Sequence, residues 1–220
     1  MVTHLRVDSS ELIFLRYSAT KPNQMKSTIK KWGVRVLGDP REKLLKKMPR
    51  NAVCAEIGVW KGDFTQQILD IAAPRELHLI DPWAYQTDFG DRLFGGLVAQ
   101  SQQDMDAIFQ GVQQRFGHRS EVHYHREFSD KAALLFADLH FDWIYIDGNH
   151  YYEFVLADLR NFFSKVKLGG YLAGDDLKWT SPELHGDLPV LRAVRDFINE
   201  QASAKLVSTY GGQFIIQKDR

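Results

Sequence analysis

The segment that most constrains the fold of this chain spans residues 141–177 and reads FDWIYIDGNHYYEFVLADLRNFFSKVKLGGYLAGDDL. It contains two short apolar runs, at 143–146 and 170–173, and each run ends at acidic residues. Between the runs, apolar residues recur at the spacing of a helix. The segment is therefore predicted to form a strand, a helix and a second strand. The apolar residues of the predicted helix are Phe154, Val155, Leu156, Leu159, Phe162 and Phe163.

A strand–helix–strand unit of this kind joins two parallel strands, so both strands end at the same edge of a sheet. Asp147 and His150 follow the first strand, and Asp175 and Asp176 follow the second. In open α/β sheets, ligands bind at the edge where the strands have their carboxyl ends. We therefore expect three carboxylates and an imidazole to meet at a functional site.

The rest of the chain from residue 52 onward continues the alternation of strands and helices. Two final strands flank Gly211-Gly212 and are typical of a hairpin, which makes the last strand antiparallel. We predict an α/β domain over residues 51–220, preceded by a basic, partly helical extension over residues 1–50. The other predicted strands are 52–57, 76–80, 121–125, 205–209 and 213–217, and the other helices are 41–48, 63–72, 103–116, 129–137 and 189–201.

Charge and cysteine content narrow the class of protein. The 28 basic and 28 acidic residues balance, so the whole molecule is not built to bind a polyanion such as nucleic acid. Residues 21–50 carry a net charge of +8, which fits a solvated surface or an anion-binding or partner-binding surface. Cys54 is the one cysteine, and no apolar run approaches the roughly 18 residues that cross a bilayer. We expect a cytoplasmic protein without membrane partners.

A glycine-bearing loop follows the first strand in the pattern Glu56-x-Gly58-x-x-x-Gly62. The dinucleotide fingerprint Gly-x-Gly-x-x-Gly, which rests a pyrophosphate on a helix, is not present in this loop. The acidic Glu56 favours a ligand with a cationic end instead. Asp81 closes the second strand, where its carboxylate is placed to bind ribose hydroxyls. An ordinary tight turn remains the alternative for the glycines.

On these residues the chain resembles the class I S-adenosylmethionine-dependent methyltransferases over residues 50–218. Within the class, IDGNHYYEFVLADL and LGGYLAGDD resemble the macrocin and mycinamicin type of small sugar O-methyltransferases, methyltransferase family 24. The resemblance implies a Rossmann-like, mostly parallel sheet of seven strands with helices on both faces and an antiparallel last strand. It also implies S-adenosylmethionine as cofactor. The cofactor-binding residues it implies are Glu56, Gly58, Gly62, Asp81, Phe128, Ser129 and Asp147, with Phe128 and Ser129 beside the adenine.

The resembling sugar methyltransferases hold a metal ion with acids at the positions of Asp147, Asp175 and Asp176. Three carboxylates suit a hard cation such as Mg²⁺. A glutamate can stand at the position of Asp175 in that subfamily, and the shorter aspartate has less reach. His150 is the candidate catalytic base, since its ordinary pKa is about 6.5. Solvated acids and a structural histidine remain the alternatives.

Together these observations predict metal-assisted O-methylation of a small hydroxylated acceptor, of sugar or phenol type. A metal-independent methyltransferase and a non-catalytic binding module with the same fold remain open, and so does a homo-oligomer. A nicotinamide-dependent oxidoreductase is disfavoured by the glycine spacing and the closing hairpin.

Overall fold

A computed structural model describes residues 39–86, 99–180 and 184–219 of the chain. The chain divides into two compact units, residues 1–37 and 38–220, and the description concerns the second. Most of the basic extension, and parts of the loops after the second and fifth strands, lie outside the described residues.

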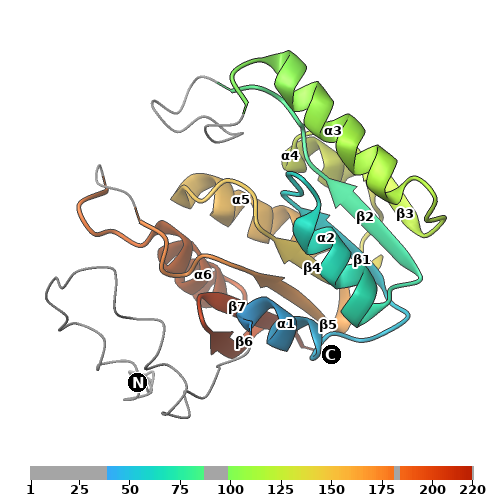
Figure 1. The fold of residues 1–220 in the computed structure, drawn as a ribbon. Helices are drawn as coiled ribbons and strands as arrows, with labels where there is room; N and C mark the ends of the chain where they lie inside the picture. The colour runs from blue at the N-terminus through green and yellow to red at the C-terminus, as the bar shows by residue number, and fades with distance from the viewer. Residues whose placement is uncertain (1–38, 87–98, 181–183, 220) are drawn as a thin grey trace, which may run out of the picture. The chain divides into compact units, whose positions relative to one another are not determined.

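A seven-stranded sheet forms the centre of this unit, with the strand order β3-β2-β1-β4-β5-β7-β6 (Figure 1). The pairs among β1 to β5 are parallel, whereas β7 runs antiparallel to both β5 and β6. The predicted fold, including the antiparallel last strand, is confirmed. The strands are β1 Val53–Ile57, β2 Glu76–Ile80, β3 Val122–His125, β4 Phe141–Ile146, β5 Val166–Gly174, β6 Ala204–Tyr210 and β7 Gln213–Lys218.

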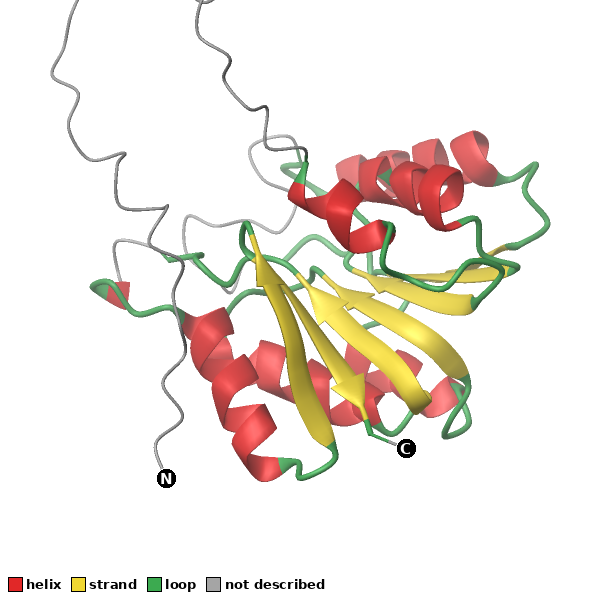
Figure 2. Cartoon of the chain, turned by 90° about the horizontal axis from the view of Figure 1, so that it is seen from below, coloured by secondary structure: helices red, strands yellow, loops and turns green. Residues whose placement is uncertain are grey.

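Helices cover both faces of the sheet (Figure 2). One core, to which α4, α5 and α6 contribute, forms on the face that includes Ala55 and Ile144. The other, to which α1, α2 and α3 contribute, forms on the face that includes Cys54 and Tyr145. Adjacent strand residues point to opposite faces, which explains how one strand supplies both cores. The helices are α1 Pro40–Leu45, α2 Asp63–Gln67, α3 Gln102–Phe116, α4 Ser129–Ala132, α5 Tyr152–Phe163 and α6 Pro189–Glu200, with the π-helix η2 Ile68–Ala72 and the 3₁₀ turn η4 Ala133–Leu135.

Several predicted elements differ from the structure in extent or in helix type. The predicted helix 129–137 consists of α4 and η4 and ends at Leu135. The first helix ends at Leu45 instead of residue 48, before the turn that leads to Pro49. The predicted helix 63–72 changes from α to π geometry at Ile68. The fifth strand begins at Val166, because Val166 pairs with Phe141 ahead of a register shift that the apolar run did not indicate.

Helix α1 belongs to the compact unit of residues 38–220. Its buried Leu44 and Leu45 join the core on the α2 side of the sheet, and the helix contacts η2 and β7. The helix begins at Pro40, one residue before the predicted range, and Asp39 caps it, since the Asp39 carboxylate accepts the Arg41 N–H at 2.9 Å. The sequence pattern alone did not show that α1 packs against the sheet.

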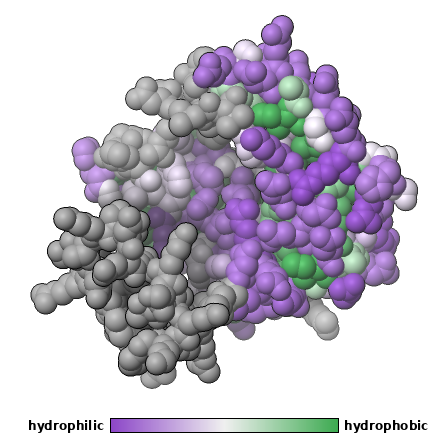
Figure 3. All heavy atoms as spheres, in the orientation of Figure 1, coloured by the Kyte–Doolittle hydropathy of each residue, from purple (hydrophilic) through white to green (hydrophobic). Residues whose placement is uncertain are grey.

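The face seen in Figure 3 is predominantly hydrophilic where described residues form it, with small apolar areas between polar ones. Among the described residues, no helix combines the length and the apolar character that crossing a bilayer requires.

Candidate active site

The five parallel strands β1 to β5 end at one edge of the sheet, and their ladder continues into the residues that follow them. The N–H of Gly58, after β1, donates to Ile80 O at 2.9 Å. The N–H of Asp147, after β4, donates to Ile57 O at 2.7 Å, and that of Asp175, after β5, donates to Ile146 O at 3.3 Å. These backbone hydrogen bonds therefore fix the positions of the Cα atoms of Asp147 and Asp175.

The glycine loop after β1 is tied to Asp81 at the end of β2. Asp81 Oδ2 accepts the N–H groups of Val59 and Trp60, both at 2.9 Å, and Oδ1 accepts the N–H of Trp83 at 2.7 Å. Burial raises the pKa of Asp81, and these three hydrogen bonds oppose the rise. Asp81 thus shapes the loop, and its Oδ1, which accepts only one of the three hydrogen bonds, keeps a lone pair for a ligand.

Two glycines of this loop stand where a side chain would collide. A Cβ on Gly58 (φ +85°) would lie 2.1 Å from Asp147 O, so β1 and β4 approach too closely there for any other residue. A Cβ on Gly62 (φ +75°) would lie 2.6 Å from the ring of Phe116 on α3. Gly62 is therefore a packing residue at the start of α2, and it does not line the cavity described next.

A cavity of about 700 Å³ lies at this edge, within the usual size range of small-molecule sites. Gly58 and Asp81 line one part of it, and residues after β4 line another. The predicted site residues that line the cavity are Glu56, Gly58, Asp81, Phe128, Ser129, Asp147 and His150. Asp175 and Asp176 do not line the cavity themselves. Asp175 contacts Arg41 and Asp176 contacts His150, and both Arg41 and His150 line the cavity.

Glu56 is a buried carboxyl that faces the cavity from β1. Its side chain is 1 % exposed and Oε2 accepts the Thr65 hydroxyl at 2.6 Å. Burial raises the pKa of Glu56 to about 8, opposed chiefly by the Thr65 hydrogen bond. The group is therefore mostly protonated at neutral pH, and a cationic ligand beside it would favour the ionised form.

Ser129 and the buried Asp158 form a second hydrogen-bonded pair on the cavity wall. Ser129 is the first residue of α4, and its hydroxyl donates to Asp158 Oδ1 at 2.5 Å. Burial raises the pKa of Asp158 to about 7. Sequence reasoning missed Asp158, although an acid on the apolar face of the predicted helix, one turn from Val155 and Phe162, was a signal for it.

The acidic cluster contains a residue that the sequence did not reveal. Arg41 of α1 lies between two of the acids, with Nη2 2.7 Å from Asp147 Oδ2 and 2.9 Å from Asp175 Oδ2, and Nε donates to Asp175 Oδ2 at 2.9 Å. Asp175 is thereby turned toward Arg41. No sequence signal places Arg41 here, since 106 residues separate it from Asp147.

His150 lies between Asp147 and the third acid, Asp176. Its Nε2 lies 2.8 Å from Asp176 Oδ2 and 3.4 Å from Asp147 Oδ1. These two carboxylates raise the pKa of His150 to about 9, against the effect of burial, so the imidazole is a cation at neutral pH. Asp176 has φ +64°, a backbone conformation that costs energy for a non-glycine residue and that is frequent at functional sites.

Asp147, His150 and Asp176 can hold a metal ion, because one ligand atom of each lies within 4.8 Å of the others. The structure thus brings together two of the three predicted metal ligands and the predicted base. The charged side chains of this acidic cluster form a chain of contacts in which the sign of the charge alternates. The order is Asp175, Arg41, Asp147, His150 and Asp176.

Comparisons with known proteins agree with this geometry. Residues 55–177 match methyltransferase family 24, described as a methyltransferase domain. The match covers more than half of the chain, so the chain belongs to this family. It is an S-adenosylmethionine-dependent methyltransferase, as the resemblance implied. No curated protein matches the chain.

Solved structures share the fold at low sequence identity. The O-methyltransferase NovP is 18 % identical, with 82 % of this chain and 80 % of NovP covered and a TM-score of 0.53. A putative caffeoyl-CoA O-methyltransferase from Staphylococcus aureus is 12 % identical, with 80 % of this chain and 80 % of that chain covered and a TM-score of 0.55. The N-methyltransferase NodS from Bradyrhizobium japonicum WM9, in complex with S-adenosylhomocysteine, is 14 % identical, with 82 % of this chain and 86 % of that chain covered and a TM-score of 0.54.

Proposed function

We propose that this methyltransferase transfers the methyl group of S-adenosylmethionine to a hydroxyl oxygen of a small acceptor, of sugar or phenol type, with the help of a divalent cation such as Mg²⁺. The observation that carries the proposal is the convergence of Asp147, Asp176 and His150 at the cavity. The O-methyltransferases among the similar structures support the same reaction class.

The cofactor's methionine end would lie at Glu56, whose ionised form would pair with its ammonium group. A ribose hydroxyl would reach the remaining lone pair of Asp81 Oδ1, and the adenine would lie toward Phe128 and the Ser129–Asp158 pair. These assignments place the sulfonium between Glu56 and the acids after β4, since both line the same cavity.

Asp147 and Asp176 would hold the cation, and Asp175 would join them if Arg41 released it. A cation bound there would stabilise negative charge on the acceptor oxygen. The acceptor oxygen forms the new bond to the methyl carbon while the electrons of the carbon–sulfur bond pass to sulfur, and His150 takes the hydroxyl proton. Neutralising Asp147 and Asp176 would also lower the pKa of His150 toward the range in which it can act as a base.

The test is transfer of labelled methyl from S-adenosylmethionine to a panel of sugars, phenols and amines, with Mg²⁺ or with a chelator. We expect labelled ethers, and activity that the chelator and Asp176→Ala abolish. His150→Ala should lower kcat by about 10²–10⁴-fold, the usual contribution of a general base, while cofactor affinity is retained. Transfer to amines alone would contradict O-methylation, and weaker cofactor binding by His150→Ala would indicate a structural role.

A second candidate, methyl transfer without a metal, is favoured by one observation. Arg41 already places a positive charge between Asp147 and Asp175. In that mechanism Arg41 would stabilise the acceptor oxygen, and the chelator would leave the activity unchanged.

A further inference from the structure

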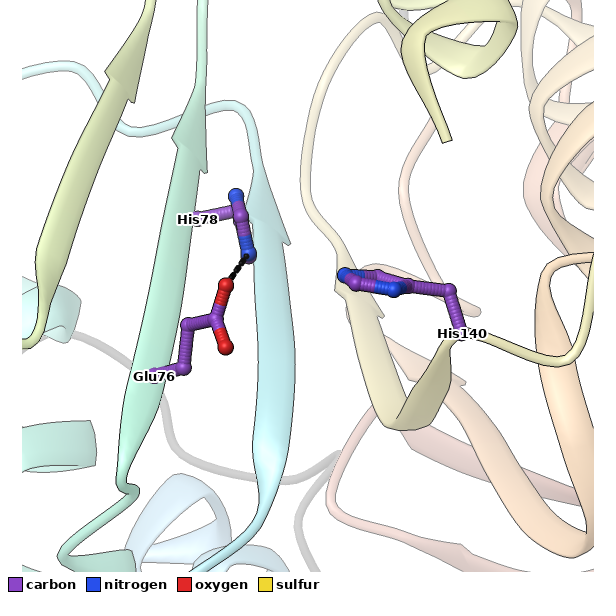
Figure 4. A group of neighbouring side chains, drawn as sticks. All are labelled: Glu76, His78 and His140. Atoms are coloured by element: carbon purple, nitrogen blue, oxygen red, sulfur yellow. Dashed lines mark hydrogen bonds and ion pairs between the residues drawn. The ribbon is translucent and has the colours of Figure 1, made fainter. Parts of the chain in front are cut away.

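A second group of metal-binding side chains lies at the opposite edge of the sheet from the cavity. Glu76 is the first residue of β2, His78 lies two residues further on the same face, and His140 directly precedes β4. One ligand atom of each lies within 4.8 Å of the others. Figure 4 shows the His140 ring pointing toward the other two across β1. The residue of β1 that pairs with His78 is Ala55, whose small side chain leaves room for this approach.

The His78 ring is held on several sides. It stacks on His123 and His125 of β3, with centroids 5.1 Å away in both cases, and it meets Phe136 and Phe141 edge-on at 5.0 and 5.4 Å. Only 7 % of the residue is exposed. The packing thus fixes the direction of both ring nitrogens, as a metal ligand requires.

The hydrogen bonds of His78 are consistent with two proton arrangements. Nδ1 lies 2.8 Å from His125 Nε2, and Nε2 lies 2.9 Å from Glu76 Oε1. If His125 donates to Nδ1, His78 Nε2–H donates to Glu76 and the pair is satisfied without a metal. If Nδ1–H donates to His125 instead, the Nε2 lone pair faces Glu76, and either a proton on the Glu76 carboxyl or a metal ion bound by both groups would satisfy the contact.

His140 favours the second arrangement. Its Nε2 is buried and has no hydrogen-bond partner among the described residues. A buried imidazole nitrogen without a partner is costly. A cation shared with Glu76 and His78 would satisfy it.

We propose that Glu76, His78 and His140 form a second metal site, which binds Zn²⁺ and serves stability rather than methyl transfer. Two imidazoles and a carboxylate are a common ligand set for this ion, and water would take the fourth position. The site would connect the starts of β2 and β4 across β1. Along β2, at about 3.3 Å per residue, Glu76 lies roughly 16 Å and His78 roughly 10 Å from Asp81, so the site is separate from the cavity edge.

The test uses the full chain without a polyhistidine tag, treated with chelator, in an Asp176→Ala background that weakens cation binding at the catalytic edge. Titration with Zn²⁺ should give one ion per chain and raise the Tm, and Co²⁺ should give the visible absorption bands of a tetrahedral site. Adding His140→Ala or Glu76→Gln should weaken Zn²⁺ binding by about 100-fold or more, because losing even a residue that only supports a ligand costs about 10–100-fold.

The matched control is His118→Ala, which removes an exposed histidine after α3 and should leave Zn²⁺ binding unchanged. Retained S-adenosylmethionine binding shows that each variant is folded. Absence of Zn²⁺ binding, or binding that neither His140→Ala nor Glu76→Gln weakens, would overturn the proposal.

Discussion

Glu56 shows how one residue can sacrifice stability for ligand binding. Its carboxyl is buried, with one hydrogen bond from Thr65, and burial raises its pKa to about 8. Such a group destabilises the ligand-free protein wherever it must ionise. A cationic ligand that pairs with the carboxylate would explain why Glu56 lies on the cavity wall.

Glu56→Gln should therefore weaken S-adenosylmethionine binding by about 10- to 100-fold, since a hydrogen bond to a charged group contributes about 1.5–3 kcal/mol. Calorimetry at pH 8 measures the effect. Methylthioadenosine, which lacks the amino-acid part of the cofactor, should bind equally to both proteins. The exposed Asp70→Asn is the matched control and should change neither affinity. An equal loss for both ligands would place Glu56 away from the ammonium group.

At the scale of elements, helix α1 packs against the sheet and also contacts the acidic residues at the edge where the cavity lies. Its Asp39 cap and buried leucines hold it against the core, and Arg41 extends from it to Asp147 and Asp175. The same helix thus contributes both packing and a charge to the site.

Arg41→Gln distinguishes the two candidate mechanisms. If a cation binds Asp147 and Asp176, loss of the neighbouring charge should tighten Mg²⁺ or Mn²⁺ binding by at least about fivefold, because a unit charge 4 Å away contributes roughly 1 kcal/mol even in bulk water. Calorimetric titration with Mn²⁺ measures this, with Lys46→Gln on the exposed side of α1 as control. Unchanged metal affinity together with lost methyl transfer would favour the metal-independent mechanism.

The elements and the acids at their ends were predictable, whereas the contacts between distant elements were not. Asp81, Asp147 and Asp175 follow apolar runs directly, so the parallel sheet brings them to one edge. The turn of Asp175 toward Arg41, and the Ser129–Asp158 pair, depend on side-chain contacts between segments far apart in sequence. Periodicity carries no information about such contacts, and the same holds for His140 beside His78.

For the whole molecule, the shifted groups predict how stability depends on pH. Glu56, Asp158 and His150 have folded pKa values raised to about 8, 7 and 9. A group with a raised folded pKa stabilises the fold below its unfolded pKa, and that contribution is lost as the pH rises through the folded value. From pH 6.5 to about 7 all three groups lower the stability as the pH rises, Glu56 and His150 continue to do so up to about pH 8, and His150 alone does so up to about pH 9.

The ligand-free protein should therefore lose stability from pH 6.5 to pH 8.5, by on the order of 2 kcal/mol, with one pKa unit equal to about 1.4 kcal/mol. Thermal unfolding at several pH values measures this, and the Tm should fall by at least about 4 °C. Glu56→Gln and Asp158→Asn should each flatten the profile. A Tm that rises over this range would show that the folded protein does not favour the protonated forms of these groups.

The cavity at the carboxyl edge of the sheet is the expected site of S-adenosylmethionine. Calorimetric titration of the full chain with S-adenosylmethionine, and in parallel with NAD, tests this claim. We expect one S-adenosylmethionine per chain, binding that Asp81→Ala and Glu56→Gln weaken, and no binding of NAD. Failure to bind S-adenosylmethionine at millimolar concentration would contradict it.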